Sequence, residues 1–264
     1  MVWRTARQLD AALSGRVLTR SDFRVPRFAL SDLAGRAVTE TISRGKHILT
    51  RVDGGMTVHT HLRMDGSWRI RPAADHTGRD HRIRLVLAND RWQAVGYLLG
   101  EVAVLPTAGE HRAVGHLGPD LLGPDWDTAE AVRRLGEQPD RPIGEALLDQ
   151  RNLAGIGNLY KSELLFLRGI DPWRPVRDVT DLRPMVELAK RLLEANSERV
   201  GQVTTGVDRP GQQSWVYGRA GRPCRRCGTP VRSAAQGDEA RERLTFWCPR
   251  CQPGQPARGA ETGC

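Results

Sequence analysis

Long apolar segments are missing from this chain of 264 residues. No run of about 18 apolar residues occurs that could cross a bilayer, and no basic-then-apolar leader precedes the first amphipathic stretch. The first absence excludes an ordinary membrane-spanning helix, and the second excludes a recognisable export signal. We therefore expect a soluble protein of the cytoplasm.

Lysine is also scarce, because only Lys46, Lys161 and Lys190 among the 40 basic residues are lysines. Arginine suits phosphate contacts but does not lose its proton at working pH, so a lysine here is a candidate for chemistry. A GC-rich genome would also favour arginine. The net charge of +9 indicates a polyanionic partner, since such an excess gathers phosphates; a merely basic surface is the alternative.

Short β-patterned runs broken by the turn signals DGG, MDG and AND fill residues 16–106, which predicts an antiparallel sandwich or barrel. Glycine and proline in HLGPDLLGPDW mark a boundary near residue 120. Helical signals follow: Asp127 with Glu130 resembles a capping box, and Pro142 stands where a helix starts. We divide the chain into a β-sandwich domain with flanking helices at 1–118, a helical domain at 119–212, a small module at 213–252 and a disordered tail at 253–264.

Four of the five cysteines form two CxxC pairs, Cys224 with Cys227 and Cys248 with Cys251, with twenty residues between the pairs. Four thiolates at this spacing match tetrahedral Zn²⁺, and so short a segment has too little core to fold without it. Disulfides are the alternative, disfavoured in a reducing cytosol. We predict a structural zinc site, with Cys264 as a free thiol in the tail.

The same module carries more arginines than acidic residues, which is typical of a nucleic-acid contact. The link from Cys227 to Cys248 is expected to form a β-hairpin, on which Arg243 would project towards a phosphate. A solvated surface position is the alternative for any single arginine.

The stretch LAGIGNLYKSELL places Gly155 and Gly157 directly before a helical run, with Asn158 near its cap. Free backbone N–H groups and the helix dipole make such a start an anion site, to which Asn158 can add a side-chain hydrogen bond. Many helices start after a glycine turn, so this motif indicates a phosphate site mainly because the same chain also has a basic hairpin.

Two further stretches of the β-rich region hold candidate residues. Lys46 opens a strand after Gly45, where it could reach a cleft or simply be exposed. In THLRMDGSW, the residues Arg63, Met64 and Asp65 form a turn, and Met64 could be an apolar wedge beside an unstacked base or a packed turn methionine. His59 and His61 share one face of their strand; with no acidic or third ligand near them, packed histidines are favoured over a metal site.

In this order, the stretches RGKHILT, HLRMDGSW, LLDQRNLAGIGNLYKSELLFLRGIDPWRP and RLTFWCPRCQ resemble the formamidopyrimidine-DNA glycosylase and endonuclease VIII family of base-excision repair. The resemblance spans residues 2 to about 252, and WVYGRAG and the LRMDG turn favour the endonuclease VIII side. It implies a catalytic β-sandwich domain, a helix-two-turn-helix domain and a zinc finger that clamp damaged double-stranded DNA and extrude the lesion base, which is out of reach inside the stack.

The resemblance also implies roles for individual residues. Lys46 would contact DNA beside the lesion and assist β-elimination, and Arg243 would grip the lesion phosphate and support δ-elimination. Asn158 would hold a phosphate next to Gly157, and Lys161 matches a position beside that turn. Met64 and its neighbours Arg63 and Asp65 would fill the gap left by the base.

One departure concerns the N-terminus. Family members begin, after removal of Met, with Pro-Glu-Gly, whose proline amine attacks the sugar C1′ and whose glutamate is the adjoining acid, whereas this chain begins inside the first helix. The amine of Met1 would be displaced by roughly 8 Å if about five residues were helical, or by about 17 Å if extended. Such misplacement abolishes attack geometry, so we expect little glycosylase activity from the chain as printed and a true start upstream.

Three functions compete at this point. The first is a glycosylase that removes damaged, in particular oxidised, bases and cleaves the abasic site by β/δ-elimination, working as a monomer on nucleoid DNA in the cytoplasm. The second is a non-catalytic binder of damaged or abasic DNA. The third is a zinc-ribbon module attached to an unrelated β domain, against which the GIGN segment and the order of the motifs count.

Overall fold

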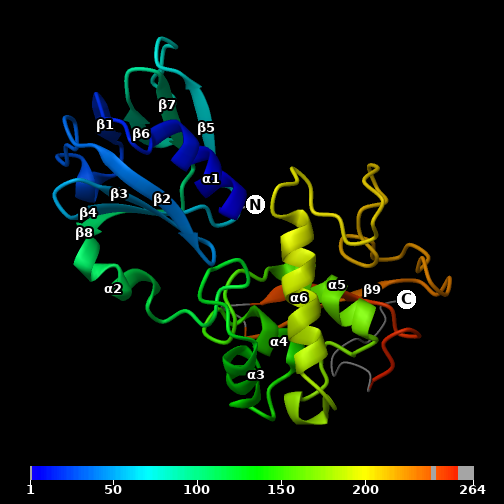
Figure 1. Cartoon of the computed structure of the whole chain (residues 1–264). Coiled ribbons are helices and arrows are strands. Elements are labelled where there is room, and N and C mark those ends of the chain that lie inside the picture. The colour runs from blue at the N-terminus through cyan, green and yellow to red at the C-terminus, as the bar shows by residue number, and fades with distance from the viewer. Residues whose placement is uncertain (1, 239–241, 255–264) are drawn as a thin grey trace. The chain divides into compact units, whose positions relative to one another are not determined.

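The computed structural model describes residues 2–238 and 242–254 and separates into two compact units, Met1–His116 and Leu117–Cys264 (Figure 1). Apart from residues 253 and 254, the tail expected at 253–264, with Cys264, lies outside the described residues. Within the described ranges, no helix has the length and apolar character needed to cross a membrane. The observed break at residue 116 lies close to the expected boundary, and the four-part division of the chain stays a prediction.

Two four-stranded antiparallel sheets build the first unit. One has the order β2-β3-β4-β8, made of β2 (Val38–Arg44), β3 (His47–Val52), β4 (Met56–His61) and β8 (Glu101–Pro106). The other has the order β1-β6-β7-β5, made of β1 (Arg20–Phe23), β6 (Ile83–Ala88), β7 (Trp92–Tyr97) and β5 (Ser67–Pro72). Ile48 and Val58 of the first sheet share a core with Leu85 and Leu87 of the second, which confirms the predicted sandwich.

Helix α1 (Val2–Leu13) closes this core with one apolar face. Leu9 and Leu13 are buried in it, and each fully buried leucine contributes about 1.5–3 kcal/mol. Asp10 accepts hydrogen bonds from the Ser14 hydroxyl at 2.6 Å and from the Thr41 N–H of β2 at 2.8 Å. The helix is therefore fastened to the sheet by both apolar and polar contacts. The unit ends with the short helix α2 (His111–Val114).

The second unit is helical with one β-hairpin. Its elements are α3 (Thr128–Gly136), α4 (Ile143–Leu148), α5 (Asn158–Arg168), α6 (Arg183–Asn196), β9 (Arg232–Gln236) and β10 (Arg243–Trp247). Asp127 caps α3 by accepting from the N–H groups of Ala129 and Glu130. Glu130 does not close the expected capping box, because its carboxylate pairs with Arg133 and Arg134 instead. Pro142 is the N-cap of α4, as the pattern predicts.

Two cores hold this unit together. Leu135, Ile143 and Leu164 belong to the larger one, between the helices. The smaller one joins Phe166 of α5 to Phe246 of β10 and to the cysteines. Helix α5 therefore takes part in both, which positions its first turn beside the hairpin.

Candidate nucleic-acid interface and zinc site

The sulfur atoms of Cys224, Cys227, Cys248 and Cys251 form a compact cluster, all within 4.8 Å of one another. The Cys224–Cys251 and Cys227–Cys248 Sγ distances are 3.9 and 3.5 Å, and all four are free thiols. Ligands 2.3 Å from a tetrahedral zinc lie about 3.8 Å apart, whereas sulfurs in a disulfide are separated by about 2 Å. The geometry fits structural zinc and not the disulfide alternative.

The second cysteine pair is tied to the helical core by Gln252. The Cys248 N–H donates to the Gln252 Oε1 at 3.0 Å, and the Gln252 Nε2 donates to the carbonyl of Ile170, just after α5, at 2.8 Å. Both Gln252 and Cys248 are buried. Metal binding at the cluster therefore also fixes the hairpin against the end of α5.

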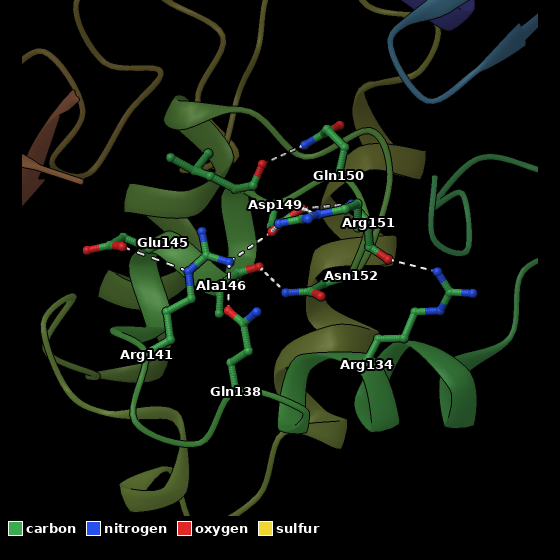
Figure 2. Close-up of polar contacts among 10 residues, drawn as sticks. Arg134, Gln138, Arg141, Glu145, Ala146, Asp149, Gln150, Arg151 and Asn152 are labelled. Atoms are coloured by element: carbon green, nitrogen blue, oxygen red, sulfur yellow. Dashed lines mark hydrogen bonds and ion pairs between the residues drawn. The ribbon is translucent and has the colours of Figure 1, made fainter. Parts of the chain in front are cut away.

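A polar network holds the loop between α4 and α5 (Figure 2). The Asp149 carboxylate accepts from Arg151 at 2.6 Å and from Arg141 at 2.8 Å, and Asn152 donates to a carbonyl of α4 at 2.9 Å. The Arg151 guanidinium, together with that of Arg141, keeps the pKa of Asp149 below its usual range. The loop that leads into α5 is thus built from side-chain contacts.

The glycine turn at the end of this loop presents the start of α5. The Gln150 side chain holds this turn through two hydrogen bonds. Its Nε2 donates to the Ile156 carbonyl at 3.1 Å, and its Oε1 accepts from the Gly155 N–H at 3.0 Å. Gly155 has a φ of +104°, a conformation that glycine adopts without strain. Gly157 is the N-cap and has no side chain to occupy the first N–H groups. The predicted helix start is confirmed, and no side chain of the N-cap occupies the N–H groups of its first turn, which an anion could bind.

The hairpin lies against this helix start. The Asn158 Nδ2 donates to the Leu244 carbonyl at 2.9 Å, which leaves its second N–H for another acceptor. Arg243, the neighbour of Leu244, begins β10 opposite Gln236, and its side chain is exposed. The predicted hairpin is confirmed, and the structure places Asn158 against the strand that Arg243 begins.

Lys161 lies in the same turn of α5 but has a different environment. Its side chain is fully buried, and its ammonium donates to the Thr245 hydroxyl of β10. It therefore has no exposed surface from which to touch DNA directly.

Lys46 of the first unit occupies the two-residue turn between β2 and β3. Arg44 and His47 pair across this turn, and Gly45 has a φ of +58°. The expectation that Lys46 opens the strand is wrong by one residue, because β3 begins at His47. The turn places Lys46 at one end of the sheet.

The turn between β4 and β5 contains Arg63, Met64 and Asp65, as expected. Met64 is 86% exposed, which fits an apolar wedge better than a packed methionine. Arg63 has a φ of +53°, its N–H donates to the His61 Nδ1 at 3.0 Å, and its side chain lies so close to Gly100 that a Cβ there would be 2.5 Å away. These contacts keep the turn, and with it Met64, in a defined position.

His59 and His61 of β4 have more polar neighbours than the sequence led us to expect. His47 Nδ1 and His59 Nε2 are 2.8 Å apart, the rings of His47 and His61 are 4.7 Å apart, and the Glu101 carboxylate is 3.6 Å from His59. The expectation of no third or acidic neighbour is therefore wrong. Burial lowers the pKa of all three histidines, that of His47 to about 3. Among the described residues, the four cysteines are the only group of three or more side chains close enough to share a metal ion. Packed histidines are therefore still favoured over a second metal site.

Sequence reasoning missed Glu163 of α5, which is fully buried. Its carboxylate accepts from the N–H groups of Trp215, Val216 and Tyr217 at 2.7–2.8 Å and from the Thr204 hydroxyl. The motif WVYG was a signal that this segment matters, but nothing local pairs it with a glutamate 52 residues earlier.

Comparison with protein families matches three models along the chain. The formamidopyrimidine-DNA glycosylase N-terminal domain matches residues 2–95, the H2TH domain of the same enzymes matches 117–205, and the zinc finger found in FPG and IleRS matches 221–254. The three matches have the order expected from the motifs.

Relatives match over nearly the whole chain. The chain is 58% identical to "Probable endonuclease 8 2" of Streptomyces coelicolor, over 99% of this chain and 96% of the relative. It is 49% identical to "DNA-(apurinic or apyrimidinic site) lyase Nei2" of Mycolicibacterium smegmatis, over 95% and 96%. Among solved structures, Lactococcus lactis Fpg in complex with DNA containing an abasic site matches with a TM-score of 0.81 at 22% identity, over 96% of this chain and 98% of that one.

Proposed function

The chain belongs to the formamidopyrimidine-DNA glycosylase and endonuclease VIII family, and from that premise we propose how its residues serve the reaction. It is a base-excision-repair enzyme that acts as a DNA glycosylase and as a lyase on the resulting abasic site. Its zinc is structural. Oxidised bases are the substrates we favour.

One observation carries the proposal for the second unit. The Asn158 side chain is hydrogen-bonded to the β10 backbone at Leu244, directly beside Arg243. A helix N-terminus, an amide N–H and a guanidinium thus offer three kinds of donor to one phosphate group. We assign phosphate binding to Gly157 and Asn158, and to Arg243 the grip on the lesion phosphate that supports δ-elimination.

Residues of the first unit would act on the sugar of the lesion nucleotide and on the space left by the extruded base. We assign to Lys46 contact with the DNA beside the lesion and assistance to β-elimination, which its place in a hairpin turn supports. Met64, largely exposed in a turn held by Arg63, would fill the space left by the extruded base, with Asp65 beside it.

The chain binds damaged DNA, as its family membership implies. We propose that the form bound is a double-stranded lesion site, that one copy suffices to clamp it, and that the protein works on the nucleoid in the cytoplasm. The surplus of basic residues supports this partner through counterion release.

Borohydride trapping on an abasic-site duplex tests whether the protein acts as a lyase, because reduction fixes an imine between an amine of the protein and the sugar. We expect the protein to form a covalent adduct with this duplex. Tight binding without any adduct would favour the alternative, a non-catalytic binder of abasic DNA.

The residue assignments are tested by substitution. Asn158→Ala and Arg243→Ala should weaken binding of the abasic duplex, and Arg243→Ala should in addition leave β-elimination product unprocessed. Arg232→Ala is the matched control, since Arg232 is an exposed arginine at the other end of the same hairpin. Equal losses in Arg243→Ala and Arg232→Ala would mean that only net charge matters at these two positions.

A further inference from the structure

Lys161 is a buried lysine that the proposed reaction does not use. Its side chain has no exposed surface, although it stands in the first turn of α5, beneath the proposed phosphate site. No carboxylate in the described parts of the chain forms a salt bridge with its side-chain nitrogen, which donates a hydrogen bond to the Thr245 hydroxyl. A lysine this deep without a counter-ion is held in its charged form at a cost.

The hydroxyl that receives Lys161 is itself held in one orientation. Thr245 donates to the Gln236 Oε1 at 2.9 Å, and the Gln236 Nε2 donates to the Pro172 carbonyl at 2.8 Å. Gly144 of α4 leaves room for this amide, since a Cβ there would be 2.5 Å from its oxygen. Thr245 therefore turns a lone pair towards Lys161, which can donate to it as an ammonium or as a neutral amine.

The charges that face Lys161 come from two elements. Burial lowers its pKa to about 7, Glu145 of α4 opposes this shift, and Arg243 of β10 adds to it. Glu145 is a weak counter-charge, because burial, with Asp238 nearby, raises its own pKa, and it also lies 3.8 Å from Arg141. The cation that most disfavours a charged Lys161 is thus the arginine assigned to the lesion phosphate.

We propose that Lys161 takes up a proton from solvent when a DNA phosphate binds at Asn158 and Arg243. The anion offsets the positive field of Arg243, so the ammonium form of the buried lysine becomes favourable and attracts the phosphate in return. Linkage makes the two effects reciprocal: binding raises proton affinity, and a lower pH strengthens binding. Lys161 is therefore a positioning residue that couples the hairpin to the helix start. This inference rests on the proposed phosphate site.

Isothermal titration of the zinc-loaded chain with a duplex that contains a tetrahydrofuran abasic analogue measures the proton directly. Titrations at pH 7.5 in two buffers of different ionisation enthalpy should show that Lys161→Met takes up roughly half a proton less per complex than wild type. Affinity of wild type should fall by up to tenfold per pH unit above pH 7, and that of Lys161→Met should fall less. Lys190→Met is the control, a part-exposed lysine of α6 paired with Glu194 at 2.9 Å.

The scarcity of lysine supplies a second measurement that needs no folded Lys161 variant. With only three lysines, carbon-13 labelling at Cε gives three resolvable signals, and Lys190→Met assigns one of them. One signal should titrate near pH 7 in the free chain and at higher pH with the duplex bound. The inference is overturned if none titrates below pH 9 without DNA, or if the duplex leaves that titration in place. Failure of wild type to prefer the analogue duplex over an undamaged one would instead count against the proposed function.

Discussion

Replacing Glu163 by glutamine is expected to destabilise the second unit and release the segment at 215–217. The fully buried carboxylate is the common acceptor for three consecutive backbone N–H groups and one hydroxyl. Oε1 serves Val216 and Tyr217, and Oε2 serves Trp215 and Thr204. Glutamine offers one oxygen and two donors in the same space, so at least one backbone N–H must face an N–H group.

The magnitude follows from these contacts. Hydrogen bonds to a charged group are worth about 1.5–3 kcal/mol, and a buried donor left without a partner costs about 1–3 kcal/mol. If glutamine keeps the pair of bonds at Oε1, the remaining loss at the Trp215 N–H amounts to about 3 kcal/mol. For a unit of this size, 1 kcal/mol lowers Tm by about 2–4 °C, so we expect a drop of about 6–12 °C. Alanine removes every acceptor and should cost more.

Thermal unfolding and amide hydrogen exchange check this prediction together. Exchange at Trp215, Val216 and Tyr217 should accelerate in Glu163→Gln more than exchange elsewhere in the unit. The matched control is Glu187→Gln on α6, where the carboxylate is half exposed and lies 4.0 Å from Arg183; it should shift Tm by little. A Tm within about 2 °C of wild type with unchanged exchange at these three residues would refute the reasoning.

Three further outcomes are expected. Removal of zinc by a strong chelator should unfold the finger and abolish binding of abasic duplex, while circular dichroism retains the signal of the helical core; retained binding at zero zinc would contradict this. Asp127→Ala removes two capping hydrogen bonds from α3 and should cost about 1 kcal/mol in urea unfolding; an unchanged free energy of unfolding would contradict this. Because burial lowers the pKa of His47 to about 3, the unfolded chain binds a proton near pH 6.5 that the folded chain does not. The free energy of unfolding should therefore fall as pH drops from about 6.5 to 4, and His47→Phe should make this fall shallower; an identical slope would show that His47 does not titrate on unfolding.

Much of the architecture could be predicted because its signals are local. Alternation of apolar and polar residues predicted the strands, and the spacing of Cys224, Cys227, Cys248 and Cys251 predicted the metal cluster. Helix starts could be predicted as well, because the N-cap residues Asp127 and Gly157 directly precede the first turn of their helices. Each of these features depends on neighbours in the sequence.

The polar interior could not be predicted, because it depends on which distant segments meet. Glu101 lies opposite His61 only because β4 pairs with β8, across a gap that includes three other strands. In the sequence, Lys161 is one polar position of a helix, and its burial depends on Thr245 of β10, more than 80 residues later. For the same reason, the burial of Glu163 could not be predicted from the sequence. Such residues look like surface charges in the sequence, and only the pairing of elements shows that they are buried.

Lys161 and Glu163 together hold α5 in place through contacts with two distant segments. Two positions apart on a helix, their side chains point about 200° from each other, so they leave on opposite sides. One donates to β10 and the other accepts from the segment at 215–217, with no shared hydrogen-bond partner. The two connections should therefore be energetically independent. In a double-mutant cycle, the losses in unfolding free energy of Lys161→Met and Glu163→Gln should add to within about 0.5 kcal/mol. A larger coupling would mean that the hairpin and the segment support each other through α5, and that neither can be altered without moving the phosphate site.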